Sequence, residues 1–254
     1  MGEIEAAMTN MLPQLFGYQD QEGDLQVHSN WTDGVNSIKD MADATKEIGL
    51  KYIAISDHAK SLAMTGGLDE KMLVKQGEEI DRLNEELSGI TILKWVELNI
   101  LKDGRVDISD NIIAELEVVG AAIHSYFNLS EDEMTLRVLM VLENPNVDIL
   151  YHPTTRQIQK REAILLDIER VIEAAHNNTK ILDVDSYPNR LDLKDEYIRK
   201  AVERGVKLSI SSDAHTTRHL RFLELGIAQA RRGWATADDV INTWKLEEVL
   251  NFIN

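Results

Sequence analysis

The sequence of 254 residues contains no cysteine. Disulfide bonds and thiolate metal sites are therefore excluded, so any metal ion must be held by His, Asp, Glu or an amide oxygen. No apolar run reaches the roughly 18 residues that a membrane span needs, and no basic segment followed by an apolar run opens the chain. We therefore expect a soluble, cytoplasmic protein that does not bind membranes.

Positive charge is also scarce, because 27 Lys and Arg stand against 44 Asp and Glu, which gives a net charge of −17. Binding nucleic acid by neutralising phosphates requires clustered Lys and Arg. Bound divalent cations, or a basic neighbouring domain, would offset this acidity locally. The charge therefore weighs against a nucleic-acid substrate without excluding one.

Seven short apolar runs, separated by segments with apolar residues at helical spacing, indicate an α/β protein. One such helical segment carries Ile164, Ile168 and Val171. Composition alone fits one barrel or two small domains. Because strands and helices alternate, we predict a barrel of buried parallel strands over residues 21–254. An arm or connector remnant over residues 1–20 precedes it, with one short amphipathic helix over residues 2–15. The predicted strands are 25–28, 52–55, 92–96, 118–123, 147–150, 181–184 and 206–210.

Polar residues stand at the end of nearly every predicted strand. In a parallel barrel these ends share one mouth, where such folds carry out their chemistry. Imidazole and carboxylate groups in this number suit Zn, Mn or Fe, and a metal pair about 3.5–4 Å apart can activate water for phosphoryl displacement. We therefore predict phosphate ester hydrolysis. The strand-end residues are Gln26, His28, Asp57, His58, Glu97, His124, His152, Asp185, Asp213 and His215.

Each of these residues also has a structural interpretation. A single His at a strand end is more often a hydrogen-bonded structural residue than a ligand, but five of the seven histidines lie at strand ends. The other two, His176 and His219, lie in helical segments and are expected at the solvated surface. Asp57 and Asp185 are expected to cap helices or to orient a ligand.

Several ordered motifs resemble those of the PHP (polymerase and histidinol phosphatase) superfamily, over residues 23 to about 250. They read GDLQVHSNWTDG, AISDHAKS, WVELNILKDG, AAIHS, YHPTTR and SISSDAH. The segments YPNRLDL and ARRGWATADDVINTW are similar to the C-terminal PHP domain of bacterial and archaeal family X DNA polymerases. The opening GEIEAAMTNMLPQL resembles the connector that precedes that domain.

The resemblance implies a distorted seven-stranded (βα)7 TIM-like barrel of PHP type with two or three divalent ions, Mn, Zn or Fe. It implies a 3′–5′ exonuclease acting on DNA 3′ ends, with a polymerase domain in the same chain. Glu97 would bridge two metals, and Glu97, His58 and Asp213 would be catalytic. Arg156 and Arg190 are expected to bind substrate phosphate, with surface salt bridges as the alternative. The implied metal ligands are His28, Asp33, His58, Glu97, His124, His152, Asp213 and His215.

Some positions depart from the family pattern. Gln26 replaces the first residue of the usual H-x-H pair, and its amide oxygen is a poorer ligand than imidazole. Thr155 stands where Gly is common, and Asp183, Asp185 and Tyr187 alter a segment that often reads EINAN-P. The expected function is a DNA exonuclease; the alternatives are a small-molecule phosphomonoesterase of the histidinol-phosphate type and a metal-binding structural module without turnover.

Overall fold

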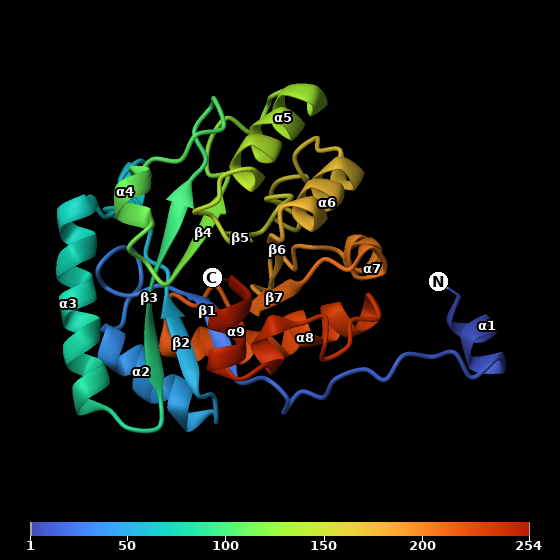
Figure 1. Cartoon of the computed structure of the whole chain (residues 1–254), viewed down its shortest axis with the longest axis horizontal. Coiled ribbons are helices and arrows are strands. Elements are labelled where there is room, and N and C mark those ends of the chain that lie inside the picture. Colours follow the sequence, from blue (N-terminus) through green and yellow to red (C-terminus); the bar gives the residue numbers. More distant parts are fainter. Residues whose placement is uncertain (1, 254) are drawn as a thin grey trace.

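The computed structural model describes residues 2–253, except for the side chain of Ala63. Seven parallel strands follow one another in chain order around a barrel that is nearly closed (Figure 1). The His28 N–H donates to the Ala214 carbonyl at 2.8 Å, which links the end of the first strand to the segment after the last. All seven predicted strands are confirmed: β1 (Gly23–Val27), β2 (Tyr52–Ile55), β3 (Thr91–Asn99), β4 (Val118–Ala122), β5 (Ile149–Leu150), β6 (Ile181–Asp185) and β7 (Leu208–Ser211).

Helices alternate with the strands and cover the outside of the barrel (Figure 1). Gly49 and Gly205 adopt φ values of 96° and 81° at the ends of two of them, as predicted, because this region favours a residue without Cβ. The α-helices are α1 (Glu3–Met8), α2 (Ile38–Glu47), α3 (Glu70–Glu86), α4 (Asp110–Ile113), α5 (Glu131–Leu142), α6 (Ile168–Asn177), α7 (Asp195–Arg204), α8 (Leu223–Arg232) and α9 (Leu246–Ile253), and the 3-10 turns are η1 (Ala63–Thr65), η2 (Thr217–Phe222) and η3 (Ile241–Thr243).

Large side chains fill the interior of the barrel, from the end where the strands begin up to Tyr151, which follows β5. Trp95, Tyr52 and Tyr151 are fully buried there and pack in one apolar cluster with Val249 of α9. A Cβ on Gly120 would lie 2.0 Å from the Tyr151 ring, so this position accepts only glycine without repacking. Since α9 and these rings close the N-terminal ends of the strands, a substrate must reach the interior from the C-terminal ends.

Asp24 in β1 is a buried carboxyl group with a strongly shifted pKa. Its oxygens accept hydrogen bonds from the Ser212 N–H at 3.1 Å and the Ser212 Oγ–H at 2.5 Å. Burial nevertheless raises the pKa of Asp24 to about 7, and Asp213 contributes to the increase. The folded protein therefore keeps this proton between pH 4 and pH 7, where the unfolded chain has released it.

We expect Asp24→Asn to flatten the pH dependence of stability in the metal-free protein. As pH rises through the folded pKa, the wild type loses the stability that comes from holding the Asp24 proton, whereas Asn has no proton to release. The difference in unfolding free energy between wild type and variant should change by about 2–3 kcal/mol from pH 5 to pH 8, in favour of the variant. Urea unfolding at several pH values measures this change, and parallel profiles for the two proteins would contradict it.

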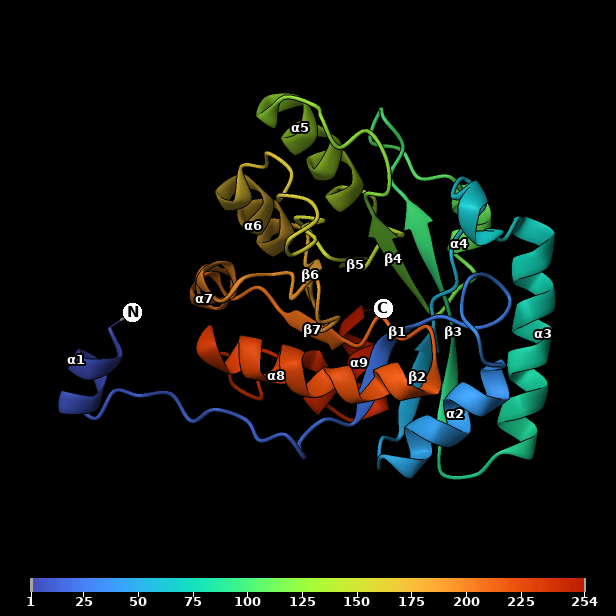
Figure 2. The ribbon, with the colours of Figure 1, turned by 180° about the vertical axis from the view of Figure 1, so that it is seen from behind.

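The N-terminal helix is shorter than the predicted segment 2–15. It ends at Met8 because Asn10 turns into the left-handed region with φ 56°, and residues 11–17 have no regular secondary structure. Both views show α1 standing apart from the barrel at the end of this segment (Figures 1 and 2). Arg231 of α8 donates to the carbonyl of the buried Phe16, which fixes the base of the arm.

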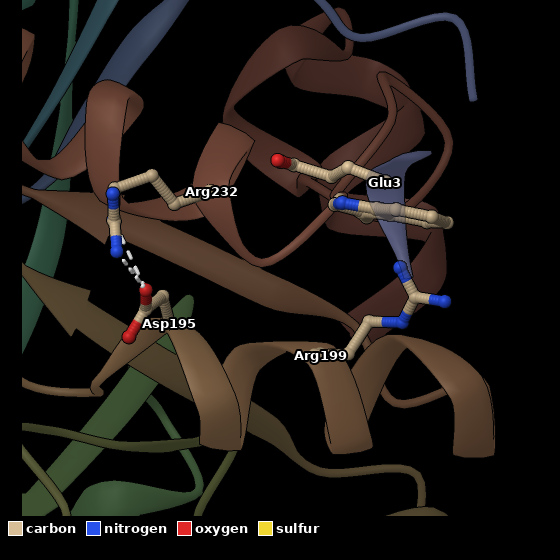
Figure 3. A pocket seen from close by; sticks show the side chains of 5 residues that line it. Glu3, Asp195, Arg199 and Arg232 are labelled. Carbon is tan, nitrogen blue, oxygen red and sulfur yellow. Dashed lines mark hydrogen bonds and ion pairs between the residues drawn. The ribbon is translucent and has the colours of Figure 1, made fainter. Parts of the chain in front are cut away.

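A hollow of 130 Å³ lies between α1, α7 and the end of α8 (Figure 3). Its lining residues Arg232 and Asp195 pair at 2.6 Å, and the Arg199 guanidinium lies 3.5 Å from the centre of the Trp234 ring. It lies outside the barrel and contains none of the predicted metal ligands.

Among the described residues, no helix is long and apolar enough to cross a membrane.

Candidate metal centre

The predicted ligands converge at the C-terminal ends of the strands. They lie in or after six of the seven strands, with two ligands after β1 and two after β7, so the barrel brings together residues up to 187 positions apart in the chain, from His28 to His215. Five imidazoles and three carboxylates meet in this cluster, and all eight predicted ligands belong to it.

One group of possible ligands lies on the side of β1 and β7. His28, Asp33, His58 and His215 each offer an atom within 4.8 Å of the others. Asp33 Oδ2 lies 3.6 Å from His58 Nε2 and 3.4 Å from His215 Nε2. Both carboxylate and imidazole atoms are thus directed at one point, as in a site that holds a transition-metal ion.

A second group surrounds Glu97 of β3, which is fully buried. Its Oε1 lies 3.0 Å from His152 Nε2 and 3.2 Å from His124 Nε2, and its Oε2 lies 3.5 Å from His58 Nδ1. Glu97 Oε2 is also 3.3 Å from His28 Nε2 in the first group. One carboxylate therefore faces both groups, which is the geometry that a bridging ligand requires.

The protonation preferences of His152 and Glu97 suit metal ligation. Burial, together with the nearby Arg190, lowers the pKa of His152 to about 4. Burial would raise the pKa of Glu97, but His58 and His124 hold it well below its usual value. Neutral imidazoles and ionised carboxylates are the forms that bind cations. His28 Nδ1 and Nε2 and Glu97 Oε2 are buried and make no hydrogen bond to another described residue, as expected of atoms reserved for a metal ion.

The position of Gln26 differs from that of the other strand-end residues. Its Oε1 accepts a hydrogen bond from the Ser211 Oγ–H at 3.2 Å, and its Nε2 has no hydrogen-bond partner in residues 2–253. Beside it, Asp213 Oδ1 lies 3.1 Å from His28 Nε2. The amide oxygen of Gln26 therefore faces a neighbouring hydroxyl group. A metal ion beside Gln26 would have fewer strong ligands than one in either of the two groups.

Asp213 and His215 converge, although β7 ends at Ser211 and does not carry them as a strand. Asp213 has φ 51°, and the His215 ring nitrogen Nδ1 lies 2.8 Å from the Asp213 carbonyl oxygen. His152 also has a positive φ, 30°. Such backbone conformations are unfavourable for residues with a Cβ and often mark functional sites.

Asn99, at the end of β3, orients the His124 ring. Its Nδ2–H groups donate to the Ala59 carbonyl at 3.1 Å and to Asp107 Oδ2 at 2.7 Å, so its Oδ1 must be the acceptor that faces His124 Nδ1 at 2.7 Å. His124 therefore carries its proton on Nδ1 and leaves Nε2 free to bind a cation. The sequence motifs did not reveal this role.

We expect Asn99→Ala to weaken metal binding about 10- to 100-fold, because His124 would lose the group that fixes its tautomer. Asn99→Asp keeps an oxygen that can accept the same hydrogen bond but sets a second carboxylate against Asp107, so its affinity should lie between those of the wild type and Asn99→Ala. Titration with a competing chelator measures the affinity. Equal affinities for Asn99→Ala and the wild type would show that Asn99 does not position His124.

Asp57 acts on the loop that carries Asp33. Its carboxylate accepts hydrogen bonds from the Ser29 N–H at 2.8 Å, the Thr32 Oγ–H at 2.6 Å and the Gln76 Nε2–H at 2.6 Å. It therefore ties the segment after β1 to α3. The prediction that Asp57 supports the site from outside the ligand set agrees with these contacts, but it supports a loop and not a histidine.

Arg190 enters the site from the loop after β6. Its Nε lies 3.1 Å from Asp185 Oδ2 and 3.6 Å from Asp213 Oδ2. Both contacts are made by Nε, so the terminal nitrogens are the atoms of this guanidinium that would meet an anion. Asp185, which stands where the family pattern has Asn, thus pairs with this guanidinium.

The guanidinium of Arg156 is less available to a substrate phosphate than that of Arg190. Its Nε donates to the Arg190 carbonyl at 2.7 Å, and its NH2 donates to the Leu191 carbonyl. The guanidinium therefore braces the loop that carries Arg190. The neighbouring Thr155 has φ 50°, which explains why the family pattern favours Gly at this position.

One histidine prediction is wrong. His176 is exposed on α6 as expected, but His219 is half-buried, and its Nδ1 accepts a hydrogen bond from the His215 N–H at 3.3 Å. The reason is that η2 folds back beside the loop after β7, which brings His219 against the ligand segment.

The comparisons with known proteins agree with this geometry. The family model of the PHP domain matches residues 24–247. The DNA polymerase/3′-5′ exonuclease PolX of Bacillus subtilis is 41% identical over 232 residues, which are 91% of this chain but only 41% of that protein. A probable phosphatase of Thermoanaerobacter sp. is 29% identical and matches 85% of this chain and 88% of its own length.

Solved structures show the same fold. Histidinol phosphate phosphatase from Lactococcus lactis, in a complex with Zn, L-histidinol and phosphate, superposes with a TM-score of 0.61 at 17% identity. The match covers 83% of this chain and 94% of that one. With the family model spanning most of the sequence and the ligand cluster at the mouth of a seven-stranded barrel, this chain belongs to the PHP family of metal-dependent phosphoesterases.

Proposed function

We propose that this chain is a phosphodiesterase that removes nucleotides from DNA 3′ ends, and that a polymerase domain belongs to the same protein. The observation that carries this proposal is the 41% identity to a relative named DNA polymerase/3′-5′ exonuclease, over 91% of this chain. The chain spans about two fifths of that relative, which is consistent with one module of a longer protein.

The residues of the cluster support the chemistry of such a reaction. Bound divalent ions would supply Lewis-acid activation of water and neutralise charge on the phosphate. Glu97 would hold two ions together, since its two oxygens face the two ligand groups. Arg190 would bind a phosphate oxygen through its terminal nitrogens, and His58 or Asp213 would accept the proton of the attacking water.

We further propose that two metal ions, Mn, Zn or Fe, bind to the two ligand groups. A third ion at the corner of Gln26 would have to compete with Ser211 for the amide oxygen and with Arg190 for Asp213. A buried guanidinium next to a carboxylate opposes a further cation by charge repulsion. Arg190 thus supplies positive charge where a third ion would otherwise do so.

A small-molecule phosphomonoesterase is the second candidate. Its support is the net charge of −17, which is unfavourable for DNA, and the relatives named probable phosphatases. Those relatives match nearly their whole length but at lower identity than the polymerase-containing one. The exonuclease therefore remains the stronger proposal.

Hydrolysis of single-stranded DNA labelled at its 5′ end, compared with p-nitrophenyl phosphate, tests the proposal in the presence of Mn²⁺. A ladder of successively shorter 5′-labelled products, lost in His124→Ala, is the expected result. Cleavage of the monoester alone would favour the small-molecule phosphatase. Bound metal without turnover on either substrate would indicate a structural module.

A further inference from the structure

Three ring side chains form a cluster beside the metal centre that the proposed reaction does not use. The aromatic cluster consists of Tyr187, from the loop after β6, and of His219 and Phe222, from η2 after β7. The Tyr187 ring is roughly perpendicular to His219, at 5.2 Å between ring centres, and to Phe222, at 5.3 Å, while His219 and Phe222 stack at 5.0 Å. The cluster thus joins two neighbouring loops at the mouth of the barrel.

The aromatic cluster is tied directly to residues of the site. The His215 N–H donates to His219 Nδ1 at 3.3 Å, so one ring is fixed to the ligand segment. On the other side, the Tyr187 N–H donates to Asp185 Oδ1 at 2.7 Å, and the Arg190 N–H donates to the Tyr187 carbonyl at 2.8 Å. A shift of these rings would therefore move Arg190 and His215.

The rings are not part of the hydrophobic core. Leu220 and Leu223, which flank Phe222 in η2 and at the start of α8, are buried, whereas all three rings of the aromatic cluster remain partly exposed. Partly exposed aromatic faces next to a phosphate-binding arginine resemble the stacking platforms of proteins that bind single-stranded nucleic acid.

We propose that the aromatic cluster is the subsite that stacks the terminal base of a single-stranded nucleic acid, while Arg190 and the metal centre hold the adjoining phosphodiester. This inference rests on the proposed exonuclease function. Stacking does not require positive charge, and one base stacked on an aromatic ring contributes about 1–3 kcal/mol. The aromatic cluster would therefore let an acidic protein bind a polyanion locally, by base stacking and metal coordination.

The test compares two oligonucleotides that differ only at the 3′-terminal nucleotide, which either carries a base or is abasic. For the wild type, kcat/KM should be about 10- to 100-fold higher with the base present, as the stacking energy implies. Tyr187→Ala should lose most of this preference, Tyr187→Phe should keep it, and Phe222→Leu should lower it. The exposed Tyr18, which precedes β1, provides the matched control as Tyr18→Ala, which should keep the wild-type ratio.

The ratio of the two kcat/KM values separates base binding from general damage, because a loosened loop would slow both substrates alike. An unchanged ratio in Tyr187→Ala, or a wild-type ratio near one, would overturn the base subsite and leave the exonuclease proposal intact. No cleavage of either oligonucleotide by the wild type would overturn both.

Discussion

Glu97→Gln should lower phosphoester hydrolysis by about 10³-fold or more, together with the metal content of the protein. The substitution preserves shape, but it replaces a carboxylate that faces four imidazoles, of His28, His58, His124 and His152, by a neutral amide. An amide cannot bridge two cations with full negative charge, and removing a metal or its charge-stabilising ligand costs several orders of magnitude in rate. Elemental analysis should give about two ions per chain for the wild type and less than one for the variant.

The exposed Glu247 on α9 offers a matched control, since Glu247→Gln removes the same charge at the end of the barrel where the strands begin. This control should keep both the metal content and the activity. The bridging role of Glu97 would be refuted by a Glu97→Gln protein that binds two ions and hydrolyses phosphodiesters at the wild-type rate.

Arg137→Met should destabilise the protein by about 3–5 kcal/mol, which corresponds to a decrease in Tm of about 10 °C for a chain of this size. Arg137 of α5 is buried, and its guanidinium donates to the carbonyls of Leu101 at 2.8 Å, of Ser125 at 2.9 Å and of Ile100. Met fills most of the volume but leaves these carbonyl groups without a donor in a buried place.

Thermal unfolding followed by circular dichroism measures this effect, and Arg170→Met, at an exposed position of α6, is the control. The control should change Tm by no more than about 2 °C, because surface substitutions usually cost little. Equal Tm values for Arg137→Met and the wild type would mean that water replaces the guanidinium at these carbonyls.

Much of the fold could be predicted from the sequence, because buried parallel strands are short apolar runs that stand out between amphipathic helices. Seven of the eight predicted ligands stand at strand ends, which a parallel barrel gathers at one mouth, whereas Asp33 was implied by the family resemblance alone. Strand ends also carried Asp57 and Asp185, and the contacts of these residues with Thr32 and Arg190 show that the position alone does not distinguish a ligand from its support.

Other parts of the site depend on contacts that local sequence does not encode. Asn99 orients His124 through bonds to Ala59 and Asp107, which come from a different strand connection and from a later loop. The family resemblance implied that Arg156 binds phosphate, but the direction of its guanidinium depends on the backbone of the next loop. His219 lies in a helical turn, and only the packing of that turn brings it to His215.

The most direct test of the account is the dependence of phosphodiester hydrolysis on metal ions. The protein would be stripped with EDTA, dialysed and assayed with bis(p-nitrophenyl) phosphate before and after the addition of Mn²⁺ or Zn²⁺. We predict no activity above background in the stripped protein and recovery that saturates at about two ions per chain. Equal hydrolysis by the stripped protein, or none after two ions have bound, would contradict the account.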